Sequence, residues 1–190
     1  QRERALHPAG LRAARRGMRL ATELHLPLVT VIDTPGAELS QFAEESGLAG
    51  EIARCLYDLL ALPVPTVSVL LGEGAGGAAL ALFPADRVVA ARHAWLSPLP
   101  PEGASAIVHR TTDRAAEMAE RQHIGAAELL RRGIVDVVVA ERPDAADEPV
   151  AFLQRIASAV RHELETLTAT EERSRRETRR ERYLDPVRLG

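Results

Sequence analysis

The 190-residue sequence contains no lysine, so all 24 of its lysine-plus-arginine residues are arginine. This absence excludes chemistry that needs a side-chain amine, such as a Walker-type phosphate-binding lysine, a Schiff base or a lysine that carries a covalent cofactor. Cysteine is almost absent as well, because Cys55 is the only one. A single cysteine can form neither an internal disulfide nor a thiolate zinc site, and its isolation is typical of a reducing compartment.

Aromatic side chains and long apolar runs are also scarce. Aromatic residues make up 3% of the chain, too few to interleave with basic residues and stack on nucleic-acid bases. The longest uncharged stretch, residues 59–72, is too short to cross a bilayer and is broken by Pro63 and Pro65. The start of the sequence is Arg-rich and has no signal-peptide core. We therefore expect a cytoplasmic protein that binds neither nucleic acid nor membrane.

The net charge of −3 is unevenly distributed along the chain. Residues 1–20 hold six Arg and one Glu, residues 21–170 hold eleven Arg and 21 acidic residues, and residues 171–190 hold seven Arg and five acidic residues. The length and the 46% of hydrophobic residues fit one domain, which we place at residues 1–168, followed by an Arg-rich tail over 169–190. Because residues 171–182 show no apolar face, they predict a solvated helix or a disordered arm.

Apolar periodicity predicts alternating helices and strands. Apolar residues at helical spacing predict a helix over residues 10–24, with Arg12, Arg15, Arg16 and Arg19 on its outer faces, and a second helix over 48–59. The remaining expected elements are strands at 28–32, 64–71, near 88–89 and at 134–139, and helices at 101–110, 113–122, 125–132 and 150–167. This alternation indicates a layered α/β fold with crossover connections.

Two strands end in glycine turns. The first reads VIDTPGA over residues 31–37 and the second reads LLGEGAGGAAL over residues 70–80. Gly76 and Gly77 begin a helix of small residues, whose first N–H groups lack intrahelical partners and suit an anion or a developing oxyanion. Gly72, Gly74 and Gly77 also match GxGxxG, but residues 90–97 hold no ribose-binding acid, so the context of a dinucleotide site is missing. DTPG is similar to a GTPase turn, yet the chain has no phosphate-binding lysine to accompany it.

No side chain stands out as a catalyst. Residues 72–82 contain no serine that could act as a nucleophile beside the second turn. The histidines are scattered without metal-ligand spacing, so we expect no metal site. They are His7, His25, His93, His109, His123 and His162. Backbone electrostatics is the catalytic device that remains, and one oxyanion donor is typically worth about 2.7–4 kcal/mol of barrier.

Six segments together resemble one protein family. They are a basic, glycine-containing first helix (10–21), DTPGA (33–37), an acidic stretch with EE and G (44–47), VP (64–65), GEGAGGA (72–78) and PEGASAI (101–107). In this order they are similar to the carboxyltransferase part of biotin-dependent acyl-CoA carboxylases, and most of all to the alpha-type half of bacterial acetyl-CoA carboxylase carboxyltransferase. The resemblance extends from about residue 8 to about residue 140.

The resemblance implies a crotonase-like (ClpP/crotonase) spiral of ββα units with a C-terminal helical extension. The family carries several strands ahead of its first helix and this sequence begins almost at that helix, so we expect those strands to be absent. Gly76 and Gly77 would form a biotin-side oxyanion hole, and Gly36 and Ala37 a second oxyanion loop. The other residues that it assigns to substrate or biotin are Gly72, Gly74, Glu102, Gly103 and Ala104. Arg12, Arg15, Arg16 and Arg19 are candidates for the phosphates of coenzyme A.

The activity that the resemblance implies is transfer of CO2 from carboxybiotin, held on a separate carrier protein, to acetyl-CoA. The product is malonyl-CoA, the precursor of fatty acid biosynthesis, and propionyl-CoA is the alternative substrate. The site would need no metal and no side-chain base, and it would be complete only with a beta-type partner in a hetero-oligomer that includes biotin carboxyl carrier protein and biotin carboxylase. Two other functions stay open: a non-catalytic assembly subunit, and an acyl-CoA hydratase or isomerase that uses Glu73 or Glu102 as its acid.

Overall fold

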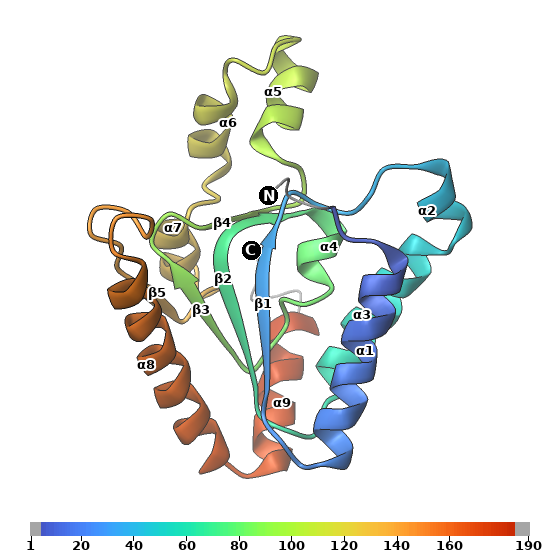
Figure 1. The fold of residues 1–190 in the computed structure, drawn as a ribbon, viewed down its shortest axis with the longest axis vertical. Helices are drawn as coiled ribbons and strands as arrows, with labels where there is room; N and C mark the ends of the chain where they lie inside the picture. The colour runs from blue at the N-terminus through green and yellow to red at the C-terminus, as the bar shows by residue number, and fades with distance from the viewer. Residues whose placement is uncertain (1–4, 185–190) are drawn as a thin grey trace.

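A parallel sheet forms the centre of the computed structural model, which describes residues 5–184 (Figure 1). Its strands follow the order β1-β2-β3-β5 and their carboxyl ends all lie at the same edge. A short strand, β4, pairs with the last part of β2. The bounds are β1 (Leu28–Thr34), β2 (Thr66–Ala75), β3 (Arg87–Ala91), β4 (Trp95–Ser97) and β5 (Val137–Val139).

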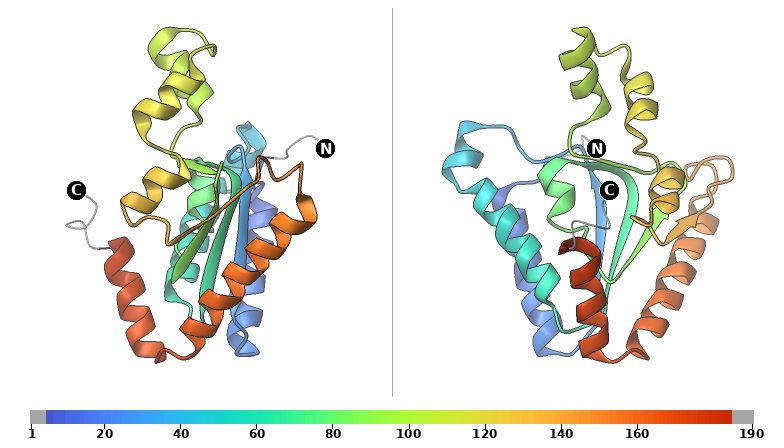
Figure 2. Two further views of the ribbon diagram at one scale, coloured as in Figure 1. Left: turned by 90° about the vertical axis from the view of Figure 1, so that its left-hand side faces the viewer. Right: turned by 180° about the vertical axis from the view of Figure 1, so that it is seen from behind.

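Helices cover both faces of this sheet. Helix α8 packs on one face against β2, β3 and β5, whereas α7 and α9 lie on the opposite face (Figure 2). Helices α1 and α3 pack against each other beyond the β1 edge (Figure 1). None of the helices in the described part of the chain is both long and apolar enough to cross a membrane. The bounds are α1 (Pro8–Glu23), α2 (Gln41–Glu45), α3 (Leu48–Ala61), α4 (Gly76–Leu80), α5 (Pro101–His109), α6 (Ala115–Gln122), α7 (Ala126–Arg131), α8 (Pro149–Thr168) and α9 (Glu172–Leu184).

The apolar core has two parts. The larger part lies around the central strands and includes the fully buried Val67, Val88 and Val89. The smaller part lies between α1 and α3, where Leu11 and Cys55 are completely buried. Burial raises the pKa of the Cys55 thiol to about 11, so this thiol stays protonated and unreactive at neutral pH.

Strand β1 lies at the edge of the sheet and is open on one face. Val29 and Val31 pair in register with the buried Val67 and Val69, yet their exposed fractions are 39% and 57%. Helix α8 covers that face over β2, β3 and β5. Among the described residues, no strand pairs with the outer edge of β1.

A register shift between β1 and β2 brings the two glycine turns together. Ile32 pairs with Leu70 but Thr34 pairs with Gly74, so β2 carries two extra residues at this point. Asp33 accepts a hydrogen bond from the Glu73 N–H on its Oδ1 atom at 3.0 Å. A Cβ at Gly72 would lie 2.6 Å from the same Asp33 oxygen, so only glycine leaves room for this contact. The bulge therefore places the end of β1 level with the end of β2.

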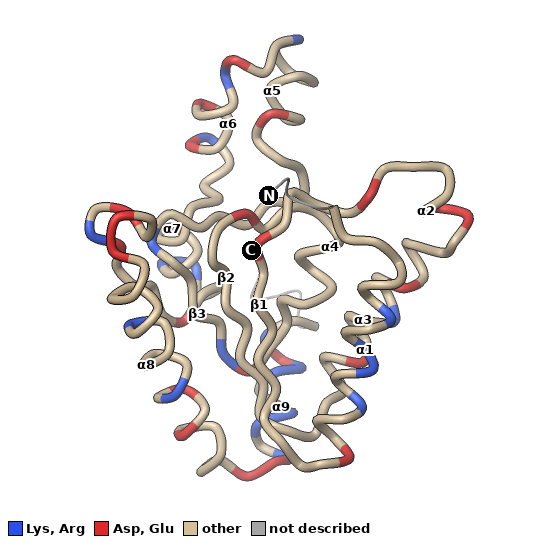
Figure 3. Tube along the Cα trace, viewed as in Figure 1, with Lys and Arg blue, Asp and Glu red and all other residues tan. Residues whose placement is uncertain are grey.

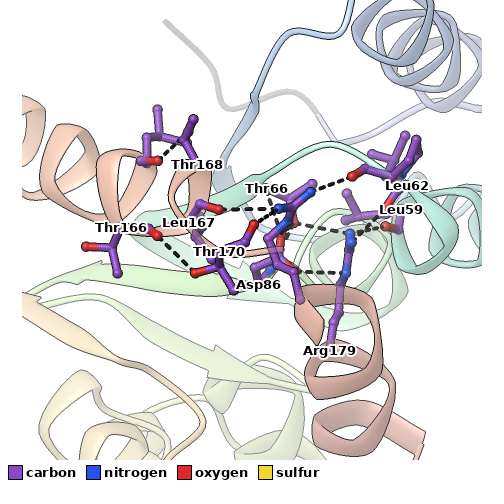
Figure 4. A network of polar contacts seen from close by, with 12 residues as sticks. Leu59, Leu62, Thr66, Asp86, Thr166, Leu167, Thr168, Thr170 and Arg179 are labelled. Atoms are coloured by element: carbon purple, nitrogen blue, oxygen red, sulfur yellow. Dashed lines mark hydrogen bonds and ion pairs between the residues drawn. The ribbon is translucent and has the colours of Figure 1, made fainter. Parts of the chain in front are cut away.

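The last helix corrects one sequence-based expectation. Residues 171–182, expected to form a solvated helix or a disordered arm, lie in α9, which buries Arg175 and Arg179. Arg179 donates to the carbonyls of Leu59 and Leu62 at 3.0 and 2.6 Å (Figure 4). These carbonyls lie at the C-terminal end of α3, where the Leu59 carbonyl also accepts from the Leu62 N–H at 3.3 Å. The helix itself was one of the two expected forms. The expectation missed the burial of Arg175 and Arg179 because it counted arginine as a solvated residue, whereas here Arg179 caps another helix.

A buried acid balances these arginines. The Asp86 side chain lies with its Oδ1 atom 3.1 Å from the Nε atom of Arg179, and its Oδ2 atom accepts from both the N–H and the hydroxyl of Thr66 at 2.8 Å (Figure 4). Burial raises the pKa of Asp86 even though Arg179 and Thr66 act in the opposite direction. Arg175 adds a bond from its Nη2 atom to the carbonyl of Pro63 at 2.6 Å. The network ties α9 to α3 and to the starts of β2 and β3.

We expect the substitution Arg179→Met to lower the free energy of unfolding by about 3–5 kcal/mol, because it leaves the Asp86 carboxylate buried without its main counter-charge. Arg176→Met on the same helix is the matched control. Arg176 makes only an exposed pair with Glu172, so its loss should cost less than about 1 kcal/mol. Urea denaturation monitored by circular dichroism measures both, and equal losses for the two variants would contradict a structural role for Arg179.

We expect Gly72→Ala to destabilise the protein by about 0.5–1.5 kcal/mol, because the new Cβ displaces the exposed Asp33 side chain and breaks its hydrogen bond to the Glu73 N–H. Gly17→Ala in α1 is the control. A Cβ at Gly17 meets nothing within 4 Å, and alanine is the better helix former by about 1 kcal/mol, so this variant should be neutral or more stable. The same denaturation experiment separates the two, and an unchanged Gly72→Ala variant would rule out the steric account of the bulge.

Candidate active site

The two glycine turns meet at the carboxyl edge of the sheet. A Cβ at Gly36 would lie 3.8 Å from the Cβ of Ala75, the last residue of β2, so the first turn lies directly beside the second. Gly36 has φ +130° and Gly76 has φ +61°, both in the region that favours glycine. The backbone therefore turns sharply at both places, as the sequence predicted.

The backbone N–H groups in these turns differ in availability. Gly76 and Gly77 are the first two residues of α4. The Gly76 N–H belongs to the β2–β4 ladder, whose last pair is Ala75 with Ser97, because Pro98 has no N–H to complete that pair. The Gly77 N–H has no partner among the turn, loop and side-chain hydrogen bonds of residues 5–184. In the first turn, Gly36 donates to the Thr34 hydroxyl at 3.2 Å. The hydrogen bonds to Leu6 use the residues on either side of Ala37, so the Ala37 N–H points away from that segment and has no partner in the described part of the chain.

This arrangement offers backbone dipoles beside two acidic residues, Asp33 of the first turn and Glu73 of the second. Two N–H groups among residues 5–184, those of Ala37 and Gly77, remain free to donate to an oxygen atom. N–H groups held in place by the fold stabilise a developing oxyanion without reorganising, which is worth about 2.7–4 kcal/mol per donor. Of the two residues expected in the first loop, Ala37 is therefore the available donor, because the Gly36 N–H is already bonded to Thr34.

Gly72 and Gly74 have packing reasons to be glycine. Gly72 accommodates Asp33, and a Cβ at the buried Gly74 would lie 2.8 Å from the Trp95 carbonyl oxygen of β4. Both residues allow the neighbouring strands to approach β2, and so they position the turn that follows. A direct contact with a substrate stays a prediction for both.

The residues of the PEG segment at the start of α5 differ in exposure. Glu102 is exposed and lines a groove of about 780 Å³ together with His93, Trp95 and residues of α6 and α7. Gly103 packs on Leu99, and Ala104 is buried. The turn before α5 does reach the second glycine turn, because a Cβ at Gly76 would lie 3.5 Å from the Pro98 carbonyl oxygen.

The four arginines of α1 are not equivalent, although all lie along this helix (Figure 3). Arg15 donates to Asp58 at 2.6 Å and to Glu51 at 3.2 Å, and the bond to Asp58 is the main reason that the pKa of Arg15 is raised. Arg12 lies 3.7 Å from Glu51. Arg16 and Arg19 form no ion pair within residues 5–184, so they keep the freest guanidinium groups for a phosphate.

Exposed apolar residues on two projecting segments were missed at the level of the sequence. The α5–α6 hairpin rises above the strand ends, whereas α2 and the segment before it project to the side (Figure 1). Their most exposed apolar residues are Leu39 (95%), Phe42 (71%), Ile107 (72%) and Val108 (57%). Leu39 and Phe42 stand among polar residues directly after DTPGA, which was the available signal. Exposed apolar surface of this kind is typical of a protein interface.

Sequence comparison finds relatives along nearly the whole chain. Residues 4–186 match the family model described as acetyl co-enzyme A carboxylase carboxyltransferase-like. A probable biotin-dependent acyl-coenzyme A carboxylase beta3 subunit of Mycobacterium tuberculosis is 58% identical over 93% of this chain and 36% of its own length. The acetyl-coenzyme A carboxylase carboxyl transferase subunit alpha of Rhizorhabdus wittichii is 41% identical over 93% of this chain and 57% of its own length.

Solved structures share the fold at low sequence identity. A hetero-dimer of Pseudomonas malonate decarboxylase superposes with a TM-score of 0.78 at 16% identity, over 97% of this chain and 76% of that one. The transcarboxylase 12S core superposes with a TM-score of 0.73 at 23% identity, over 88% of this chain and 32% of that one. These likenesses confirm the crotonase-like α/β fold.

The chain spans about a third of the length of the mycobacterial relatives that it matches. Within that span, the family model covers almost every residue, and the six segments that suggested the family all lie inside it. The chain belongs to the acetyl-coenzyme A carboxylase carboxyltransferase-like family, with a crotonase-like fold.

Proposed function

We propose that this chain provides one half of a carboxyltransferase site, which transfers a carboxyl group from carboxybiotin to the α-carbon of a short acyl-CoA. Acetyl-CoA is the substrate proposed first, which makes malonyl-CoA the product. The observation that carries the proposal is the free N–H group of Gly77, held beside the Ala37 turn at the carboxyl edge of the sheet. Family membership supports the same reaction class.

In the proposed mechanism the chain acts through its backbone. When bound, carboxybiotin supplies the carboxyl group, and its ureido oxygen takes up the proton that the acyl α-carbon loses. The N–H group of Gly77 holds the ureido oxygen and stabilises the negative charge that develops on it. The Ala37 N–H is placed to polarise a second carbonyl in the neighbouring turn. No side chain of this half needs to move a proton.

The site supports assembly with other chains. The apolar residues Leu39 and Phe42 in and before α2, and Ile107 and Val108 at the end of α5, are exposed. A beta-type carboxyltransferase half that covers these residues would exclude water and complete the site. We propose that biotin arrives on a biotin carboxyl carrier protein, which is loaded by biotin carboxylase. The proposed assembly is thus a hetero-oligomer.

The alternatives make different demands on the site. A hydratase or isomerase would need an acid beside the glycine turns, and Glu73 stands in the second turn itself, whereas Glu102 lines the groove between the α5–α6 hairpin and α7. A purely structural subunit could keep the same turns, because Gly77 is only half-buried and its N–H can bond to water. The experiments below distinguish a catalytic half from an assembly subunit.

We expect the isolated chain to catalyse no carboxyl transfer, and activity to appear when the beta-type half is added. The assay follows malonyl-CoA decarboxylation with biocytin as acceptor, and light scattering monitors association in the same samples. A complex that forms but stays inactive would identify an assembly subunit. Mass analysis of the product formed with acetyl-CoA and with propionyl-CoA then identifies the preferred acyl group.

We expect Gly77→Pro to lower kcat of the complex by about 10²–10³, because proline removes one oxyanion donor and is otherwise tolerated in the first turn of a helix. Gly77→Ala is the matched control. Both variants bring a side chain to within about 3.1 Å of Ile52 Cδ1, but alanine keeps the N–H. The oxyanion role of Gly77 would be refuted by a proline variant that is as active as the alanine variant. Thermal unfolding shows whether both remain folded.

A further inference from the structure

The loops that follow β3 and β5 bring together one histidine and two carboxylates. These strands pair in parallel with Ala91 opposite Val139, so the chain leaves both at the same edge of the sheet. His93 follows Ala91 and Glu141 follows Val139 at the same spacing, and the pairing continues through a bond from the Arg92 N–H to the Val139 carbonyl at 2.9 Å. Register alone therefore places His93 beside Glu141.

The side chains of this cluster have the spacing of metal ligands. The Nδ1 atom of His93 lies 3.1 Å from Glu141 Oε2 and 4.0 Å from Asp144 Oδ2. One ligand atom from each of the three residues lies within 4.8 Å of the other two. Ligand atoms around a tetrahedral zinc ion, each about 2.0–2.2 Å from the metal, are separated by about 3.3–3.5 Å. Small side-chain movements would bring all three onto one ion.

Backbone N–H groups hold both carboxylates in place. Glu141 accepts from the His93 N–H on Oε1 at 3.0 Å and from the Ala145 N–H on Oε2 at 3.1 Å. Asp144 accepts from the Ala146 N–H on Oδ1 at 2.8 Å, which leaves its Oδ2 atom toward His93. Carboxylates that are fixed by bonds of this kind are typical of a preorganised metal site.

The charge of Glu141 is the second observation. Four carboxylates are buried among the described residues, and three of them, Glu51, Asp86 and Glu163, have arginine within ion-pair distance. Glu141 is only 5% exposed, yet its sole ion-pair partner within residues 5–184 is His93. A buried carboxylate needs a compensating charge. In a chain with 24 arginines, the lack of one here leaves room for a cation.

We propose that His93, Glu141 and Asp144 bind one divalent transition-metal ion, with Zn²⁺ as the best fit. One imidazole and two carboxylates suit Zn²⁺ better than Mg²⁺ or Ca²⁺, which take oxygen ligands. Three protein ligands leave the fourth position of a tetrahedral ion to water or to another ligand. The ion ties the β3–β4 turn to the β5–α8 loop, at the rim of the groove that His93 shares with Trp95 and Glu102.

To test this, the full chain is treated with EDTA, buffer-exchanged and titrated with ZnCl2 in an isothermal titration calorimeter. We expect one equivalent to bind, and binding to weaken at least tenfold in His93→Asn and in Asp144→Asn. His93 and Asp144 are about half exposed, so both variants should fold, and circular dichroism checks this. His123→Asn is the control, because His123 lines the same groove but lies outside the cluster.

Co²⁺ provides an independent spectroscopic readout. We expect a visible absorption band of protein-bound Co²⁺ in the wild-type chain and in His123→Asn, and its loss in His93→Asn. Equal Zn²⁺ affinity in all four proteins would show adventitious binding to surface histidines and overturn the proposal. Absence of wild-type binding would do the same, and would identify His93 and Glu141 as a simple ion pair. Neither result depends on carboxyltransferase activity.

Discussion

The pairing of β1 with β2 is the constraint on which the site depends. Strand β2 is longer than β1. If the two strands paired without a bulge, β2 would extend past the end of β1, and the turns that follow them would not lie side by side. The contact between Asp33 and the Glu73 N–H absorbs the two extra residues of β2 in a bulge, and Gly72 provides the space. The turn after β1 then lies against the turn after β2. The free N–H groups of the two turns therefore come together through a hydrogen bond between the turns themselves, from the Glu73 N–H to Asp33.

Arginine side chains form several of the hydrogen bonds that join separate elements of the fold. The chain has no lysine, and several of its arginines lie where a flexible ammonium group would fit poorly. Arg179 reaches two carbonyls at the end of α3 and an acid at the start of β3, which a planar guanidinium with several donors can do at once. Arg182 similarly joins Asp136 to the carbonyls of Gly133 and Ile134. The basic C-terminal segment is thus part of the packed body.

Much of the fold could be predicted from the sequence, because its central elements have clear periodicity. The strands at 28–32 and 64–71 and the helices at 48–59 and 150–167 correspond to β1, β2, α3 and α8. Strand β2 continues to Ala75, through glycines that were expected to turn, because β4 pairs with that part. Strand β4 and helix α2 were missed since three and five residues are too few to show a period. The strand predicted at 134–139 is shorter in the structure. Residues 134–136 lie outside β5, because the Asp136 side chain accepts from the Val88 N–H.

The candidate site was predictable only where its signal is local. Gly77 stands near the end of a buried strand, so its role follows from neighbouring residues. The Asp33 contact joins residues 40 positions apart, and the His93–Glu141 pair joins residues 48 positions apart. No spacing rule finds such pairs, because they arise from the register of parallel strands. The burial of Arg179 could not be predicted from the sequence for a similar reason, since its hydrogen-bond partners lie more than 110 residues away.

The open edge of β1 has a consequence for how the molecule meets other polypeptides. An unpaired strand presents a row of main-chain donors and acceptors, and here the exposed Val29 and Val31 add apolar contacts beside it. An extended segment from any source can extend the sheet there by strand addition, and a second molecule can do so edge to edge. Within residues 5–184 nothing pairs with this edge, so an incoming strand would meet main-chain groups and the two valines at once.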